Sequence, residues 1–335
     1  MNYKKYNIKI YCSFILFFLI LNDYINLFFS KNNKGRIFLC TTYNNEAEIL
    51  YIHLWRLYDY VDKFIIVISN ITHSGLPKNV TFNSYKENIK KYKNKIDLVY
   101  FNNICNKKEY PDNIEKSQRD YAKYYIEEKY HPNNKDLLIV LVLDEILTRE
   151  GIEYIKKNPP KDFYFIKGSM YFPYYYHRVS DWDKSFIVRY NKNMKTLSKY
   201  RRMKNTKNNT LIYEFNSTKP LITHCSYCFK TIEEYRYKLQ SFGHQEFNRP
   251  PYITNNWIFK SHYCRQKIAK SSYGYDEPYE GWSHLIPNDD RLKYLIDRSF
   301  IFQIEKTTYT KEHLKKLCSK TFNRKPFELS AKYKQ

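Results

Sequence analysis

Short apolar runs that suit buried strands alternate with amphipathic segments that suit helices along the first half of this chain. Apolar residues dominate the runs at 36–42, 63–69, 97–101 and 136–143, and they recur at helical spacing over 46–58, around 85–96 and around 121–126. Continuously apolar strands are buried on both faces, which is typical of parallel sheets covered by helices on both sides. The alternation therefore predicts an α/β fold with a mostly parallel sheet flanked by helices.

The pattern becomes less regular after residue 163. Strands are expected at 163–167, near 186–190 and in a segment that ends at Ile222, and helices at 231–242 and 289–304. A catalytic domain over 36–305 accounts for these elements, and the Lys-rich segment 306–335 is expected to form a basic C-terminal tail.

Residues 10–29 are strongly apolar and follow a tail at 1–9 that carries Lys4, Lys5 and Lys9. The continuous apolar run is about a dozen residues long, which by itself suits the apolar region of a signal peptide. However, no small-x-small cleavage site follows it, and apolar residues resume after Asn22-Asp23. We therefore expect an uncleaved signal anchor at 10–29, a short stem at 30–35 and a luminal domain, with a cleaved signal peptide as the alternative.

The chain carries 57 Lys and Arg against 34 Asp and Glu, a formal net charge of +23. Such a charge attracts polyanions, so nucleic acid has to be considered as a partner. The cations are spread through the chain, and their densest cluster, at 191–210, is typical of a solvated loop. No zinc-finger, RNA-binding or homeodomain motif accompanies them, so we expect no nucleic acid partner.

Sequons and cysteines are compatible with a luminal domain. Four Asn-x-Ser/Thr sequons begin at Asn70, Asn79, Asn208 and Asn216. Six cysteines follow the apolar N-terminal segment, an even number that allows disulfides in an oxidising compartment.

Asp144 and Glu145 directly follow the most continuously apolar run after residue 36. Ligands of parallel sheets bind beyond the carboxyl ends of the strands, so two acids here point to a binding site, although they can equally cap the following turn. None of the seven glycines builds a dinucleotide-binding or P-loop motif, so a nucleotide would be held by a metal ion and side chains. A nucleotide-sugar transferase needs a hard cation for the departing diphosphate and a carboxylate for the acceptor's proton.

Several motifs occur in the order in which one family of glycosyltransferases carries them. They are Asn45-Glu46, Tyr60-Val61-Asp62-Lys63-Phe64-Ile65-Ile66-Val67, Asn70-x-Thr72-x-Ser74-Gly75, Glu115-x-x-Gln118-Arg119-Asp120, Asp144-Glu145-Ile146 and His224-Cys225-Ser226-Tyr227-Cys228-Phe229. The most distinctive is Lys238-x-x-Ser241-Phe242-x-His244-x-Glu246-Phe247-Asn248, followed by Pro250-Pro251-Tyr252. Over about residues 36–300 the chain resembles glycosyltransferase family 17, the bisecting β-1,4-N-acetylglucosaminyltransferases.

This resemblance implies a Rossmann-like, GT-A-like nucleotide-diphospho-sugar transferase fold behind a type II anchor in the membrane of the Golgi or another secretory compartment. It implies transfer of N-acetylglucosamine (GlcNAc) from UDP-GlcNAc to the β-linked mannose of an N-glycan or glycoprotein acceptor, in β-1,4 linkage and with inversion. A Mn²⁺ ion, or Mg²⁺ in its place, is the implied cofactor.

The resemblance also suggests roles for nine polar residues. The expected metal ligands are Asp144 and His224, the expected nucleotide-sugar-binding residues are Glu46, Gln118, Arg119 and Asp120, and the expected catalytic residues are Glu246, Glu145 and His244. Glu246 is preferred to Glu145 as the base that deprotonates the acceptor. The structural alternatives are a helix N-terminal acid for Glu46, an ion pair with Glu115 for Arg119 and a hydrogen-bonded structural histidine for His224.

Two acidic residues of the family pattern are missing from this chain. Where the family carries Asp-Val-Asp-Glu-Ile-Pro, this chain reads Val142-Leu143-Asp144-Glu145-Ile146-Leu147, so a valine replaces the first acid. The family's Val-Glu-Ser-Asn is Val67-Ile68-Ser69-Asn70 here, so a second carboxylate is also missing. Either the enzyme tolerates these losses, or it uses another donor, or the chain is a catalytically inactive relative that binds glycans or a partner protein.

Overall fold

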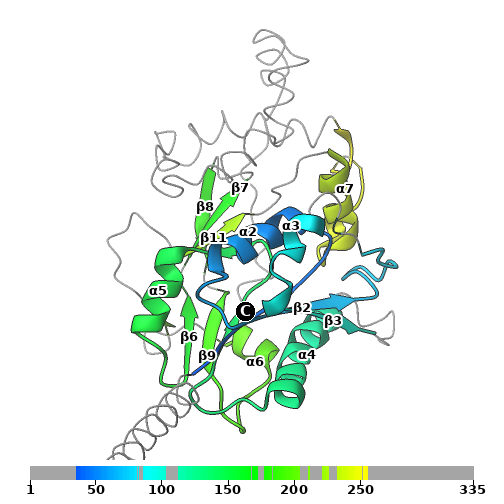
Figure 1. Cartoon of the computed structure of the whole chain (residues 1–335). Coiled ribbons are helices and arrows are strands. Elements are labelled where there is room, and N and C mark those ends of the chain that lie inside the picture. Colours follow the sequence, from blue (N-terminus) through cyan, green and yellow to red (C-terminus); the bar gives the residue numbers. More distant parts are fainter. Residues whose placement is uncertain are drawn as a thin grey trace, which may run out of the picture.

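The computed structural model describes residues 35–80, 82, 86–102, 112–166, 168–172, 177–182, 184–203, 210–211, 221–225, 232–250 and 252–255. Two β-sheets and their helices make up this part of the chain (Figure 1). The strands are β1 (Ile37–Thr42), β2 (Lys63–Ser69), β3 (Ile96–Phe101), β4 (Leu137–Val140), β5 (Glu145–Leu147), β6 (Phe163–Ile166), β7 (Gly168–Phe172), β8 (His177–Trp182), β9 (Phe186–Arg189), β10 (Thr210–Leu211) and β11 (Ile222–Cys225). The helices are α2 (Ala47–Leu57), α3 (Lys86–Lys90), α4 (Asp112–Tyr130), α5 (Arg149–Lys157), α6 (Leu197–Arg201) and α7 (Ile232–Ser241), with 3₁₀ turns η2 (Lys93–Lys95) and η4 (Gln245–Phe247).

The larger sheet has seven strands in the order β10-β6-β9-β4-β1-β2-β3. β1 runs parallel to both β2 and β4, β2 is parallel to β3, and β6 is parallel to β10. Only β9 runs antiparallel to its neighbours β4 and β6 among these described strands. The predicted α/β fold with a mostly parallel sheet is therefore confirmed.

Alternating side chains of the central strands build a core on each face of this sheet. In β1, Ile37 and Leu39 point to the face covered by α2 and α5, whereas Phe38 and Cys40 point to the face covered by α4 and α6. β4 alternates in the same way. Both faces are apolar because both are covered, which is why these strands read as continuous apolar runs.

A smaller sheet of four strands, in the order β5-β11-β7-β8, adjoins the first. β11 is antiparallel to β5 and parallel to β7, and β8 is antiparallel to β7. Thr148, which caps the N-terminus of α5, also donates its hydroxyl hydrogen to the Leu221 carbonyl oxygen over 3.0 Å. The cap therefore joins the start of α5 to the residue before β11.

One predicted strand is wrong in its extent. The apolar run 136–143 was expected to be a single strand, but β4 ends at Val140 and the chain turns at 143–144 before β5 starts. The physical reason is the Glu145 carboxylate, whose Oε2 accepts a hydrogen bond from the Val142 backbone N–H over 2.9 Å. Asp144 consequently lies on a turn between the two sheets rather than at the end of a strand.

The helix expected around 85–96 is also shorter than its apolar pattern indicated. Helix α3 ends at Lys90 and is followed by the separate 3₁₀ turn η2, which leads into β3. The strand expected to end at Ile222 instead starts there, as β11, and the expected loop at 191–210 contains helix α6. The other predicted strands in the described ranges occur within a few residues of their expected bounds.

Several predictions concern residues outside the described ranges. These are the tail, anchor and stem before residue 35, the helix at 289–304 and the C-terminal tail. The proposed domain bounds therefore stay predictions. Of the helices that the structure describes, none has the length and apolar character needed to cross a membrane.

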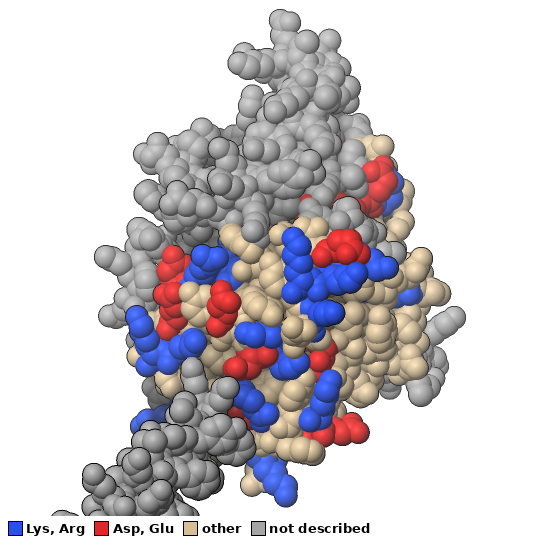
Figure 2. Space-filling view, in the orientation of Figure 1, with Lys and Arg blue, Asp and Glu red and all other residues tan. Residues whose placement is uncertain are grey.

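Charges of both signs cover the face of the molecule seen in Figure 2. Lys and Arg side chains lie among Asp and Glu side chains and uncharged surface there. One cation of the predicted solvated loop at 191–210 points inward: Arg201, at the end of α6, has a side chain that is only 13% exposed.

Candidate active site

The strand order creates a binding position between β1 and β4. From β1 the chain first adds β2 and β3 on one side. It then returns to add β4 on the other side of β1, so the strand order reverses between β1 and β4. In α/β sheets, ligands bind beyond the carboxyl ends of the two strands at such a reversal. Glu46 follows β1 and Asp144 follows β4, so both acids reach this edge of the sheet.

Two buried side chains hold the turn that carries Asp144. His53 of α2 donates its Nε2 hydrogen to the Leu143 carbonyl oxygen over 2.8 Å, and Glu145 accepts from the Val142 N–H. Both side chains are fully buried. Burial lowers the pKa of His53 to about 4, so its imidazole is neutral near pH 7. These contacts fix the backbone immediately before and after Asp144.

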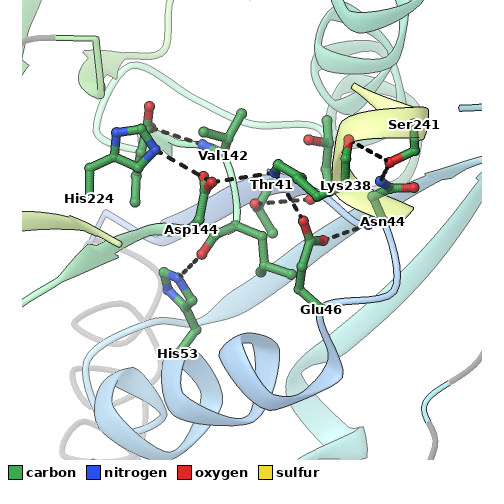
Figure 3. A network of polar contacts seen from close by, with 12 residues as sticks. Thr41, Asn44, Glu46, His53, Val142, Asp144, His224, Lys238 and Ser241 are labelled. Atoms are coloured by element: carbon green, nitrogen blue, oxygen red, sulfur yellow. Dashed lines mark hydrogen bonds and ion pairs between the residues drawn. The ribbon is translucent and has the colours of Figure 1, made fainter. Parts of the chain in front are cut away.

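Lys238 of α7 places its ammonium between the two acids (Figure 3). Its Nζ lies 3.5 Å from Asp144 Oδ2 and 3.4 Å from Glu46 Oε1. Burial acts to raise the pKa of Asp144, but Lys238 and His224 outweigh it and hold that pKa below its usual range. Burial likewise acts to lower the pKa of Lys238, but Asp144 and Glu46 raise it above its usual range. Lys238 and Asp144 therefore form a charged pair near pH 7.

His224 completes this group from the smaller sheet. Because β11 pairs with β5, His224 lies opposite Glu145 in the register, one residue beyond Asp144. His224 Nε2 is 3.4 Å from Asp144 Oδ2, the oxygen that also faces Lys238. The structure thus brings together three predicted site residues, namely Glu46, Asp144 and His224.

The end of α7 docks on the loop after β1. Asn44 Nδ2 donates a hydrogen bond to Ser241 Oγ over 3.0 Å, and the Asn44 backbone N–H donates to Glu46 Oε2 over 3.0 Å. Ser241 is one helical turn after Lys238, so this contact holds the helix face that carries the lysine. Asn44 Oδ1 is buried and has no hydrogen-bond partner among the described residues, which leaves an acceptor at the site.

A second lysine, Lys78, lies near Glu46. Its Nζ donates to the Tyr43 carbonyl oxygen. Burial lowers the pKa of Lys78 to about 8, with a further lowering from Lys238 that Glu46 opposes. Burial raises the pKa of Glu46, although both lysines act against this rise. Two lysines and two acidic residues therefore share a partly desolvated position.

The three predicted nucleotide-binding residues of α4 make contacts within the protein. Gln118 Nε2 donates to the Val67 carbonyl oxygen over 2.8 Å. Arg119 forms the anticipated ion pair with Glu115, and Asp120 Oδ1 accepts from the Ser198 backbone N–H over 2.7 Å. These contacts attach α4 to β2 and α6, and nucleotide binding by the three residues stays a prediction.

The two glutamates considered as bases differ in accessibility. Glu246 of η4 is 53% exposed and contacts His244 Nδ1 through its Oε1 over 2.9 Å. Glu145 is fully buried and accepts hydrogen bonds from Ser185 Oγ and from the Arg201 guanidinium, over 2.7 Å and 2.8 Å. An acceptor sugar can approach Glu246, whereas every Glu145 oxygen faces a group of the protein itself.

Sequence reasoning missed several residues of this site. Lys238 was noticed only as part of a distinctive motif, and no role was assigned to Asn44, His53, Lys78 or Ser241. The Lys238-x-x-Ser241 spacing, which puts both residues on one face of a helix, was the available signal for α7. His53 gave no such signal, because a lone histidine on an apolar helix face is equally compatible with the core.

Comparison with known proteins identifies the family. A model of glycosyltransferase family 17 matches residues 25–269. The chain belongs to glycosyltransferase family 17. No curated protein matches this family 17 chain. Among solved structures, the inositol-1-phosphate CTP transferase from T. maritima matches 47% of this chain and 71% of its own, at 8% identity and a TM-score of 0.25, a likeness too low to carry an argument.

The side chains present do not fit the Mn²⁺ ion that family 17 membership led us to expect. The described part of the chain holds no group of three or more His, Cys, Asp and Glu side chains arranged for a metal ion. Asp144 and His224 do meet, but the Lys238 ammonium faces the same carboxylate oxygen and position 142 is a valine. A divalent ion about 4 Å from an ammonium is repelled by roughly 8 kcal/mol at an effective dielectric constant of about 20.

Proposed function

We propose that this family 17 glycosyltransferase moves GlcNAc from UDP-GlcNAc to the β-linked mannose of an N-glycan, in β-1,4 linkage and with inversion. The observation that carries the proposal is the convergence of Glu46, Asp144 and Lys238 beyond the carboxyl ends of β1 and β4. Nucleotide ligands of α/β sheets occupy this position.

Donor binding would use the two lysines of this site and the hydrogen-bond acceptor Asn44 Oδ1. Lys238 and Lys78 offer ammonium groups to the diphosphate oxygens, since charge-assisted hydrogen bonds to phosphate are among the strongest in proteins. The buried Asn44 Oδ1 offers an acceptor for a ribose hydroxyl or for the uracil N–H. Both lysines and Asn44 would thereby fix the anomeric carbon for attack.

Transfer would be a single in-line displacement. The mannose 4-hydroxyl oxygen attacks the anomeric carbon of GlcNAc from the face opposite UDP, and its proton passes to the Glu246 carboxylate. The bond from that carbon to the diphosphate breaks, and UDP leaves with the electron pair. The half-exposed Glu246 suits a base that must meet a large acceptor, and the adjacent His244 would orient it.

We place this reaction in the Golgi or another secretory compartment, with the chain anchored through residues 10–29. Of the four sequons, Asn70 and Asn79 lie in the described ranges, and both are exposed. Exposure is what N-glycosylation of a luminal domain requires.

The test is incubation of the purified full-length chain with UDP-GlcNAc and an N-glycan carrying the trimannosyl core. Mass spectrometry should detect the addition of one N-acetylhexosamine, and NMR should show a β-1,4 linkage to the β-linked mannose. Glu246→Gln should lower kcat by about 10²- to 10⁴-fold, which is the usual contribution of a general base. Glu233→Gln, at an exposed position of α7, is the matched control and should keep wild-type activity.

Two results would contradict parts of the proposal. Binding of UDP-GlcNAc without transfer to any N-glycan would indicate the inactive glycan- or partner-binding relative, for which Val142 in place of an acid is the relevant observation. Absence of donor binding, with transfer from another nucleotide sugar, would overturn the proposed donor.

A further inference from the structure

We infer that Lys238 supplies the positive charge of the donor site, so that this chain binds the diphosphate of a nucleotide sugar without a divalent metal ion. The inference rests on the proposed function for the identity of the ligand. The position of the lysine between two acids does not depend on that function.

Geometry places the Lys238 ammonium where a metal ion would otherwise bridge the acids. Its Nζ is at nearly equal distances from Glu46 Oε1 and Asp144 Oδ2, 3.4 Å and 3.5 Å. These acids follow the adjacent parallel strands β1 and β4, and His224 approaches the same Asp144 oxygen from the other sheet. In the part of the chain that the structure describes, the lysine therefore lies beside the acids that a cation at this edge would contact.

The charge of the site is balanced without a metal ion. Glu46 and Asp144 bring two acidic side chains, and Lys238 and Lys78 bring two basic ones. Val142 stands where the family carries an acid, so the extra negative charge that would call for a divalent ion is missing. The two carboxyl groups within 3.5 Å of Lys238 Nζ favour the charged form of the lysine.

Lys238 is held in place and remains accessible. The contact between Asn44 Nδ2 and Ser241 Oγ, together with the hydrogen bond from Ser74 N–H to the Ser241 carbonyl oxygen, fixes the end of α7. The lysine side chain is 19% exposed, more than Glu46 at 9% or Asp144 at 14%. Of these three side chains, the lysine is therefore the most open to a ligand.

The first experiment uses Mn²⁺ alone, followed by electron paramagnetic resonance of the full-length chain. We expect no saturable Mn²⁺ site in the wild type. Lys238→Ala should gain one, because Glu46, Asp144 and His224 then face an emptied position. Its affinity for Mn²⁺ should exceed the residual affinity of the wild type by about tenfold or more. Asp144→Asn in the Lys238→Ala background should abolish the gained site. A saturable wild-type site that Asp144→Asn removes would overturn the inference.

The second experiment titrates UDP into the same protein by calorimetry, with either EDTA or Mn²⁺ present. We expect the two dissociation constants to agree within about twofold, and Lys238→Ala to weaken binding in EDTA by about tenfold or more. Lys238→Arg should retain part of the affinity, and Lys157→Ala, at an exposed position of α5, should retain all of it. The comparison of wild-type UDP affinity in EDTA and in Mn²⁺ tests the inference even if a Lys238 variant does not fold.

The two experiments separate the inference from the proposed function. UDP binding that requires Mn²⁺ would overturn the inference and leave the proposed donor intact. If UDP does not bind in either condition while the wild type also lacks a Mn²⁺ site and Lys238→Ala gains one, the proposed donor fails and Lys238 as the resident cation is supported.

Discussion

Arg201 and Glu145 form an ion pair in the interior, beside the turn that carries Asp144. Arg201 Nη2 lies 2.8 Å from Glu145 Oε1, and the Glu145 side chain has no solvent exposure. Burial acts to raise the pKa of Glu145, but Arg201 outweighs it and the net shift is downward. A residue from the most basic segment of the sequence is therefore part of the support of the site.

Arg201→Met is expected to lower the free energy of unfolding by about 3–5 kcal/mol, because it leaves the Glu145 carboxylate buried without its charged partner. Urea unfolding at pH 7.5 would measure this loss. Lys199→Met is the matched control. Because this lysine of the same helix is exposed, its replacement should lower the free energy of unfolding by no more than about 0.5 kcal/mol. Equal stabilities of the two variants would contradict a structural role for the pair.

His53 predicts a loss of stability on mild acidification. Its folded-state pKa of about 4 lies below the usual value near 6.5, so the unfolded chain binds more protons between these limits. The stability contributed by neutral His53 is complete above about pH 6.5 and is lost as the pH falls towards 4. From pH 7.5 to pH 5 this amounts to roughly 2 kcal/mol.

The check is urea unfolding of the wild type and of His53→Gln at both pH values. Glutamine can still donate to the Leu143 carbonyl oxygen but does not titrate. The variant should therefore show the smaller pH dependence, by about 2 kcal/mol. The same pH dependence in both proteins would show that His53 is not the titrating group.

The sheet was predictable because it depends on patterns that short stretches of sequence carry. β1 and β2 are buried on both faces, and their continuous apolar runs predicted them almost to the residue. The break after β4 was not predictable in this way. It depends on a buried glutamate whose charge is paired by Arg201, 56 residues later in the chain.

The acids of the candidate site were predictable from the sequence, but the lysine between them was not. Glu46 and Asp144 follow apolar strands, so strand pattern and motif both pointed to them. Lys238 reaches these acids from a helix about 94 residues beyond Asp144, and no spacing rule connects positions so far apart. Gln118 carries a family motif residue, yet its side chain attaches α4 to β2, since a motif fixes residue type without fixing its contact.

Gly168 is required by a close approach of two strands in the smaller sheet. It pairs with Ile222 in the β7–β11 register, and a Cβ atom here would lie 2.5 Å from the Ile222 carbonyl oxygen. Gly168→Ala should therefore destabilise the protein by about 1–3 kcal/mol, because backbone has to move to admit the methyl group. Thermal unfolding would measure this, with Lys161→Ala at an exposed position as the control.

Lys78 predicts that donor affinity falls as the pH rises above neutral. Its pKa of about 8 means that the ammonium is mostly charged at pH 7 and mostly neutral at pH 9. If it contacts the diphosphate of UDP-GlcNAc, whose phosphate groups stay fully ionised over this range, the affinity should fall by about three- to tenfold between these values. Calorimetric titration in EDTA would measure it. Lys78→Gln should bind more weakly at pH 7 and lose this pH dependence, whereas a wild-type affinity that is constant from pH 7 to 9 would place Lys78 outside the donor site.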